Sequence, residues 1–231
     1  PFGYTNIPGW DITALVAQPT IVNDSNGMPL TGVKAVSTGA DHTCYINSAD
    51  EVWCMGFMPG FEPATSCPKI ENKTPAECAV FPRPNGILVT NVSDVGGLNS
   101  VKGMWVANTP QQIPTTYTPV ELSSGDDHVC MRVSNPGVNE GNIHCWGNSA
   151  FGQVGDGTNN HWTDPRLVIT DTDGDTVLAT QIDLGGRHSC ALVDNSNINC
   201  WGSNAASQIG NSDLMRDESY RPFDVRLEVA P

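Results

Sequence analysis

Three segments of the chain repeat one pattern of short apolar-rich stretches separated by polar turns. They begin at Val33, Val120 and Thr180. In each, one stretch leads into Gly-x-x-His-x-Cys, a second stretch and a polar turn follow, and the segment closes on Cys-(Trp/Met)-Gly. Short runs bounded by Gly, Asn and Asp predict β-strands rather than helices. The repetition predicts an architecture in which each unit buries one face against the next.

The spacing of the repeats divides the chain. His128 and His188 are 60 residues apart, which is one full repeat. His42 precedes His128 by 86 residues, too many for one repeat and too few for two, so we expect an insertion between them. We therefore predict a single repeat domain over residues 1–231. Its expected parts are a half repeat at 1–22, a repeat at 23–56, a cysteine-bearing insertion at 57–82, a degenerate repeat at 83–117, and repeats at 118–168 and 169–231.

The composition agrees with an all-β chain and excludes a membrane-spanning one. The 231 residues include 23 Gly and 17 Pro, which interrupt helices and favour turns. No apolar run approaches the ~18 residues that a membrane helix needs. The net charge of −14 disfavours contact with nucleic-acid phosphates and anionic lipid. The chain begins at Pro1 without a signal peptide, so we expect a processed or excised piece.

Eight cysteines fall into four close pairs, and no Cys-x-x-Cys is present to indicate a zinc or thioredoxin site. Each pair closes a short loop, as two antiparallel strands joined by a hairpin would. We predict four local disulfides, which indicate a protein that is extracellular or at the cell surface. The alternative is buried free cysteine. The predicted pairs are Cys44–Cys54, Cys67–Cys78, Cys130–Cys145 and Cys190–Cys200.

The repeated residues resemble the RCC1 (regulator of chromosome condensation) repeat family, in the cysteine-bearing form common in secreted bacterial proteins. This resemblance implies a β-propeller of four-stranded blades, usually seven of them. A repeat of about 55–60 residues leaves room for roughly four blades, so we expect an all-β, disulfide-stapled propeller or partial propeller. The resemblance rests on Gly39, His42, Cys44, Cys54 and Gly56; on Gly125, His128, Cys130, Cys145, Trp146, Gly147, Gly152, Gln153 and Gly155; and on Gly185, His188, Cys190, Cys200, Trp201, Gly202, Gln208 and Gly210.

The repeated histidines and tryptophans are predicted to be structural. Because each histidine stands at a fixed place in its repeat, we expect its ring to bond to backbone rather than to act in catalysis. Trp146 and Trp201 follow a cysteine directly and are expected to stack between neighbouring blades. The alternative for these indoles is exposure for sugar binding.

No catalytic motif is found, so we expect no enzyme and no cofactor. The one metal candidate is DTDGDT, which places Asp171, Asp173 and Asp175 around Gly174 as at the start of a calcium loop. The twelfth position from Asp171 is Ile182 instead of the Glu of an EF-hand. An Asp/Gly β-turn is the alternative.

The sequence therefore favours a non-enzymatic extracellular scaffold that acts by protein–protein contacts. Guanine-nucleotide exchange on chromatin, which the resemblance would suggest, is opposed by the charge and the disulfides. One alternative is a carbohydrate-binding module that uses Trp10, Trp105 and Trp162. Another is a secreted ligand that inhibits an enzyme.

Two features indicate how partners could bind. The insertion carries Phe57, Met58 and Phe61, which we interpret as a partner-contact loop; folding back to cap an open blade is the alternative. Residues 2–22 resemble only the second half of a repeat, so we expect unpaired strand edges that recruit copies of the chain head-to-tail into oligomers or filaments. A closed four-bladed ring and a fragment of a longer parent remain the alternatives.

Overall fold

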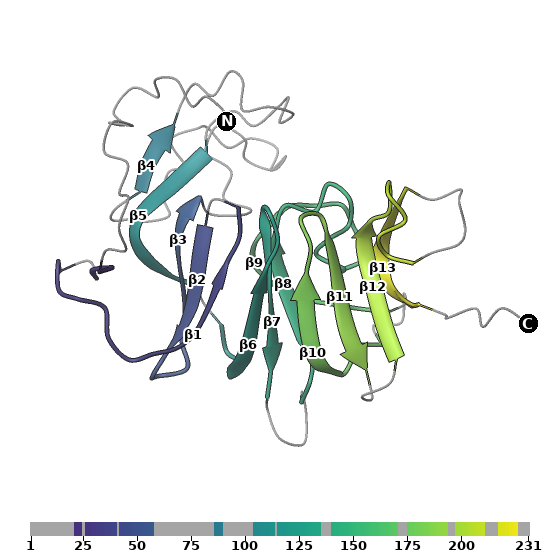
Figure 1. The fold of residues 1–231 in the computed structure, drawn as a ribbon, viewed down its shortest axis with the longest axis horizontal. Coiled ribbons are helices and arrows are strands. Elements are labelled where there is room, and N and C mark those ends of the chain that lie inside the picture. Colours follow the sequence, from purple (N-terminus) through teal and green to yellow (C-terminus); the bar gives the residue numbers. More distant parts are fainter. Residues whose placement is uncertain are drawn as a thin grey trace, which may run out of the picture.

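The computed structural model describes residues 21–24, 26–40, 42–57, 86–89, 104–113, 115–134, 140–170, 175–193, 197–210 and 217–225. In these residues every regular element is a β-strand, and the strands form three antiparallel sheets that stand side by side (Figure 1). None of these described residues belongs to a helix long and apolar enough to cross a bilayer.

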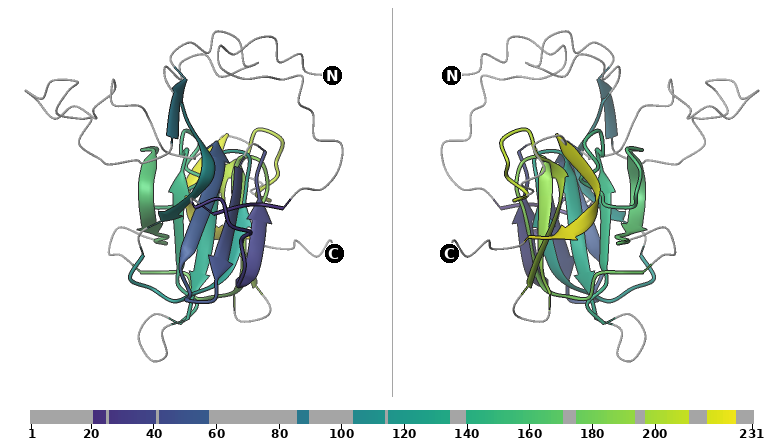
Figure 2. Two further views of the ribbon diagram at one scale, coloured as in Figure 1. Left: turned by 90° about the vertical axis from the view of Figure 1, so that its left-hand side faces the viewer. Right: turned by 90° about the vertical axis from the view of Figure 1, so that its right-hand side faces the viewer.

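The three sheets, here called blades 1 to 3, follow one another along the chain. Blade 1 has the strand order β1-β2-β3-β5-β4, blade 2 the order β6-β7-β8-β9 and blade 3 the order β10-β11-β12-β13. Viewed along the row, the blades stand behind one another (Figure 2). The strands are β1 Val33–Thr38, β2 His42–Asn47, β3 Val52–Phe57, β4 Gly86–Val89, β5 Met104–Ile113, β6 Pro119–Ser124, β7 His128–Val133, β8 Ile143–Gly147, β9 Trp162–Leu167, β10 Ala179–Leu184, β11 His188–Val193, β12 Asn197–Ser203 and β13 Glu218–Asp224.

One hairpin register recurs in all three blades. The two cysteines of each blade are direct partners across the second and third strands, with Cα atoms 4.1 Å apart. The repeated histidine always pairs with the glycine that closes the motif: His42 with Gly56, and in the same way in the other blades. The repeated spacing in the sequence is thus a repeated hairpin.

A glycine two residues after the second cysteine lets the third strand bend. Gly56, Gly147 and Gly202 have φ angles of 89°, 113° and 101°. In every blade the pairing with the outer strand shifts register between the cysteine and this glycine. A bulge with positive φ suits glycine, which lacks the Cβ that makes this region costly.

The core lies in the two seams between the blades, and not within any single sheet. Side chains alternate along each strand, so Val129 and Met131 of β7 face blade 1 while Cys130 faces blade 3. The seam between blades 1 and 2 buries Cys44, Val52, Cys54, Ile113, Val129, Met131, Val133 and Trp146. The seam between blades 2 and 3 buries Cys130, Ile143, Cys145, Val154, Val168, Val177, Ala179, Ile182, Ala191 and Trp201.

The strands can be compared with the expected division of the chain. Those of blade 2 lie within residues 118–168 and those of blade 3 within residues 169–231. Residues 83–117 were expected to form a degenerate repeat, but their described strands β4 and β5 belong to the sheet of blade 1. The reason is that β5 takes the outer position beside β3 that β9 and β13 take in the other blades. The half repeat predicted at 1–22 lies almost wholly outside the described residues.

Candidate functional site

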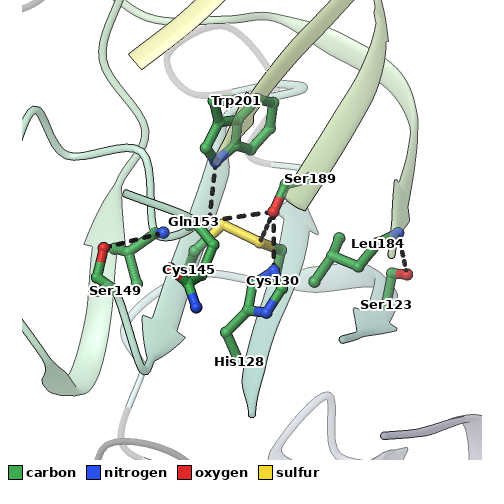
Figure 3. Close-up of a disulfide and its surroundings, with 10 residues drawn as sticks. Ser123, His128, Cys130, Cys145, Ser149, Gln153, Leu184, Ser189 and Trp201 are labelled. Carbon is green, nitrogen blue, oxygen red and sulfur yellow. Dashed lines mark hydrogen bonds between the residues drawn. A yellow bond between two sulfur atoms is a disulfide. The ribbon is translucent and has the colours of Figure 1, made fainter. Parts of the chain in front are cut away.

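The seam between blades 2 and 3 is built around the Cys130–Cys145 disulfide (Figure 3). Trp201 of blade 3 is fully buried in one cluster with this disulfide. Its indole N–H donates to the main-chain oxygen of Gln153, in the loop after β8, at 2.9 Å. The hydroxyl of Ser189 donates to the same oxygen at 3.0 Å. Two groups of blade 3 are therefore anchored on one carbonyl of blade 2.

His128 completes this arrangement as a neutral ring. Its Nε2 lies 2.9 Å from the Ser189 hydroxyl oxygen. That hydroxyl has one proton and gives it to Gln153, so His128 must carry the hydrogen on Nε2 and donate it. The ring is fully buried, and this burial lowers the pKa of His128 to about 3. A charged imidazolium is excluded at neutral pH, which makes the residue a poor general acid and a stable structural donor.

The open edge of β10 is satisfied by side chains of blade 2. The Leu184 N–H donates to the Ser123 hydroxyl at 3.1 Å, and the Ile182 N–H donates to the Glu121 carboxylate at 3.2 Å. Glu121 is held by an ion pair with Arg132 at 2.7 Å. Unpaired strand edges invite pairing with other chains, and here the neighbouring blade takes up that capacity.

The blades approach to backbone contact beside the histidines. A Cβ placed on Gly125 would lie 2.6 Å from the carbonyl oxygen of Gly185 and 2.3 Å from Cε1 of His128. A Cβ on Gly39 would lie 2.4 Å from the Gly125 oxygen. No side chain fits at these distances. The blades can therefore pack this closely only if glycine stands three residues before the histidine.

The seam between blades 1 and 2 uses the same frame with fewer polar contacts. Trp146 shares one buried cluster with Cys44 and Cys54, as Trp201 does with the next disulfide. Val129, directly opposite Trp146, stands where Ser189 stands opposite Trp201. Within the described residues, the Trp146 indole N–H and both ring nitrogens of His42 have no hydrogen-bond partner. The apolar packing is therefore the constant part of a seam, and the hydroxyl network is an addition.

Blade 3 carries the same loop as blade 2 on its far side. The Gln153 carboxamide oxygen accepts the Phe151 N–H at 2.9 Å, and the Gln208 carboxamide oxygen accepts the Ala206 N–H at 2.8 Å. Ser207 has a φ of 59° where Gly152 has 80°. The far side of blade 3 thus presents the elements that receive a blade within the chain. Unlike His128, His188 is only partly buried, and this burial lowers its pKa.

Three of the four predicted disulfides are formed in the structure, at the expected pairs Cys44–Cys54, Cys130–Cys145 and Cys190–Cys200. The fourth pair, Cys67 and Cys78, lies outside the described residues. Trp146 and Trp201 are buried between blades as predicted, with no exposed surface for a sugar.

Of the three residues of the predicted calcium loop, Asp175 is among the described residues, whereas Asp171 and Asp173 lie outside them. The main-chain oxygen of Asp175 accepts the Thr170 N–H at 2.7 Å, next to the bridge between Ile169 and Thr176. No group of three His, Cys, Asp or Glu side chains is placed for a metal ion in the part of the chain that the structure describes.

The predicted contact aromatics are found in different settings. Phe57 ends β3, whereas Met58, Phe61 and Trp10 lie outside the described residues. Trp105 is in β5. Trp162 in β9 is partly buried: its N–H donates to Asp156 at 2.7 Å, and the Arg166 guanidinium covers one ring face at 3.4 Å from the centroid.

The roles of several seam residues were not predicted from the sequence. Gln153 was recognised as part of the repeat, but the atom that matters is its main-chain oxygen, which leaves no signature in the sequence. Ser189, Val129 and Thr43 occupy one position in the three blades, so the serine reads as a variable residue. The hairpin register, counted from the histidine, is the signal that would have identified this position.

Comparison with known proteins agrees with the fold. Two family models described as the regulator of chromosome condensation (RCC1) repeat match residues 33–58 and 179–208 and residues 140–192. The ultraviolet-B receptor UVR8 of Arabidopsis thaliana is 33% identical over 90 residues, which cover 39% of this chain and 19% of that protein.

Solved structures show the same architecture. Yeast RCC1 (Prp20) in its complex with Kap60 superposes with a TM-score of 0.54 at 22% identity, over 84% of this chain and 35% of that one. Human WBSCR16 superposes with a TM-score of 0.55 at 17% identity, over 87% of this chain and 43% of that one. The chain thus spans less than half the length of these relatives. Together with the repeated blades, these matches identify residues 33–58 and 140–208 as similar to RCC1 repeats.

Proposed function

We propose that the chain is a non-enzymatic scaffold that works through protein–protein contacts and assembles with copies of itself. The observation that carries the proposal is one position seen in three blades. Val52 and Ile143 are 0% exposed because the next blade covers them, whereas Ile198 of blade 3 is 47% exposed. An apolar side chain that is buried in every internal seam and open at the end of the row favours a further blade as its partner.

The chemistry of the seams supports a structural role. His128 is neutral and already bonded, and the Ser189 hydroxyl is committed to Gln153 and His128. A nucleophile and base need access to substrate, which these fully buried groups lack. The yeast protein Prp20p, whose fold this chain shares, binds Gsp1p and histones, which supports protein partners for a chain of this fold.

We propose an extracellular or cell-surface location, as in secreted bacterial proteins of this type. The support is the set of disulfides, which persist in oxidising compartments. A net charge of −14 favours solubility and protein partners over nucleic acid. Sugar binding through Trp162 is less favoured than a protein partner, because its N–H and one ring face are already engaged.

Sedimentation velocity over a hundredfold range of protein concentration tests the proposal, with the disulfides intact. We expect the mass to rise above the 24.6 kDa of one chain as the concentration increases. A single species of one-chain mass at every concentration would refute self-assembly.

A further inference from the structure

We infer that blade 3 of one copy binds blade 1 of the next copy, so that the row of blades continues from chain to chain in one direction. This inference rests on the proposed self-assembly and adds the two surfaces and their polarity. The back face of blade 3 is defined by Cys190, Leu192 and Ile198. The front face of blade 1 is defined by Val33, Val36 and Thr43.

The back face of blade 3 matches the surfaces that receive a blade inside the chain. Cys44 and Cys130 are 0% exposed under the neighbouring blade, whereas Cys190, in the same hairpin position, is only partly buried. Ile198 pairs with Leu192 across the hairpin, and both lie on the side that faces away from blade 2. The surface that blades 1 and 2 use to bind a successor is therefore open on blade 3.

The front face of blade 1 is the matching half, and its clearest residue is Val36. Val36 is 63% exposed, whereas Ile182, at the same place in blade 3, is 4% exposed against blade 2. Leu122, at the same place in blade 2, packs against the buried cluster of the first seam. This position is covered, fully at Ile182 and partly at Leu122, where a preceding blade is present.

Val33 repeats the comparison at a second position. It is 44% exposed, whereas Ala179 in blade 3 is 4% exposed and Pro119 in blade 2 is buried. All three open the first strand of their blade, with partners at the end of the second strand. Two neighbouring apolar positions on β1 thus lack the cover that their equivalents have. The contact centres on them, because Tyr45, further across this face, is already 3% exposed.

The polar groups of the two faces also correspond. Thr43 pairs with Met55 in β2 and β3, the register in which Ser189 pairs with Trp201. Its hydroxyl therefore takes the place from which Ser189 meets His128, and the partner in the next copy is His188. Met55 brings no N–H for the Gln208 carbonyl, but the first seam forms without that hydrogen bond as well.

The two faces differ from each other, so the contact is heterologous. After two copies bind, one of them keeps a free front face and the other a free back face, so growth continues at both ends. The angle between successive blades decides whether the row closes into a ring or remains open. In either case blade 1 and blade 3 contribute different residues, which makes the two halves separable by mutation.

The test uses Ile198→Asp and Val36→Asp as one-face variants of the whole chain, with Val120→Asp as the control. Val120 is 43% exposed on β6 and belongs to neither face, and Lys34 stands at its place in blade 1. A buried carboxylate is costly, so each one-face variant is expected to weaken association at least tenfold. Near-ultraviolet circular dichroism confirms that the folded state is retained.

Mixing the two one-face variants gives the decisive result. The Ile198→Asp chain keeps its front face and the Val36→Asp chain its back face, so the mixture should form heterodimers and nothing larger. A mixture that stays monomeric, or variants that assemble like the wild type, would overturn the inference while leaving self-assembly intact. A wild-type chain that is monomeric throughout would instead overturn the proposed function.

Discussion

The Nε2 atom of His128 lies 2.9 Å from the hydroxyl oxygen of Ser189, 61 residues further along the chain and in the next blade. Ser189 in turn donates to Gln153, and Trp201 donates to that same carbonyl. The second seam is therefore a buried, connected polar network set in an apolar contact. The first seam, with Val129 at the serine position, is the natural comparison.

Replacing Ser189 by alanine should lower the free energy of unfolding by about 1–3 kcal/mol. The loss leaves the His128 N–H unpaired in a fully buried site. Thr180→Ala removes an exposed hydroxyl that donates to Leu192 and should change stability by less than about 0.5 kcal/mol. Urea unfolding measures both, and equal losses in the two variants would contradict the role assigned to Ser189.

Gly125→Ala should destabilise the chain by more than Gly27→Ala. The added methyl group would meet the Gly185 oxygen at 2.6 Å, and overpacking of this kind costs typically 1–3 kcal/mol or more. Gly27 has a φ of 77° with no atom within 4 Å of the added Cβ, so it isolates the backbone cost of about 1 kcal/mol. Thermal unfolding compares the stability of the two variants. A Gly125→Ala chain as stable as Gly27→Ala would show that the blades can move apart at this point without a loss of stability.

The stability of the chain should fall as the pH falls from about 6.5 toward 4. Burial lowers the pKa of His42 to about 4 and that of His128 to about 3, from 6.5 in the unfolded chain. The unfolded state therefore takes up protons first, and each histidine removes about 1.4 kcal/mol per pH unit inside this window. Above pH 6.5 the two buried histidines no longer lower the stability of the folded chain.

His128→Gln provides the check on that assignment. Urea midpoints of the variant and the wild type, measured at several pH values between 7 and 4, should converge as the pH falls, because one buried histidine has been removed. Two curves that stay parallel would mean that His128 takes up its proton in the folded and unfolded states alike.

Removal of the Cys130–Cys145 disulfide should cost more than removal of Cys190–Cys200. Closing loops of 15 and 10 residues gives similar entropic terms of about 3 kcal/mol. The first bridge also supports Trp201 in the core, whereas Cys190 is partly exposed on the back face of blade 3. Double alanine variants compared by urea unfolding measure the difference, and equal losses would show that packing on the sulfur atoms adds nothing.

The repeated part of the chain could be predicted from the sequence because spacing determines a hairpin. Cys44 and Cys54 face each other for the same reason as Cys190 and Cys200, since the loop length and the flanking motif are the same. The placement of β5 could not be predicted in this way. A strand that returns to β3 after a long insertion depends on tertiary packing, and no local pattern marks its partner.

Only part of the hydrogen bonding and packing in the seams could be predicted from the sequence. The buried tryptophans follow from their place beside cysteine, but the acceptor of Trp201 is a main-chain oxygen, and any residue at Gln153 would supply one. The sequence also does not show which blade faces are exposed. Val36 and Ile182 are the same kind of residue and differ only in what covers them.

Each described disulfide closes a loop inside one hairpin, of 10, 15 and 10 residues, and none of them crosses a seam. When the chain is pulled from its two ends, the force therefore acts first on side-chain packing and hydrogen bonds. The blades can separate while the three described bridges stay closed, and the short loops that these bridges close withhold little of the contour length. When the tension falls, the second and third strands of each blade are already joined in register, and the outer strands pair again before the blades dock. The row of blades can therefore extend under load while each disulfide keeps its own pair of strands together.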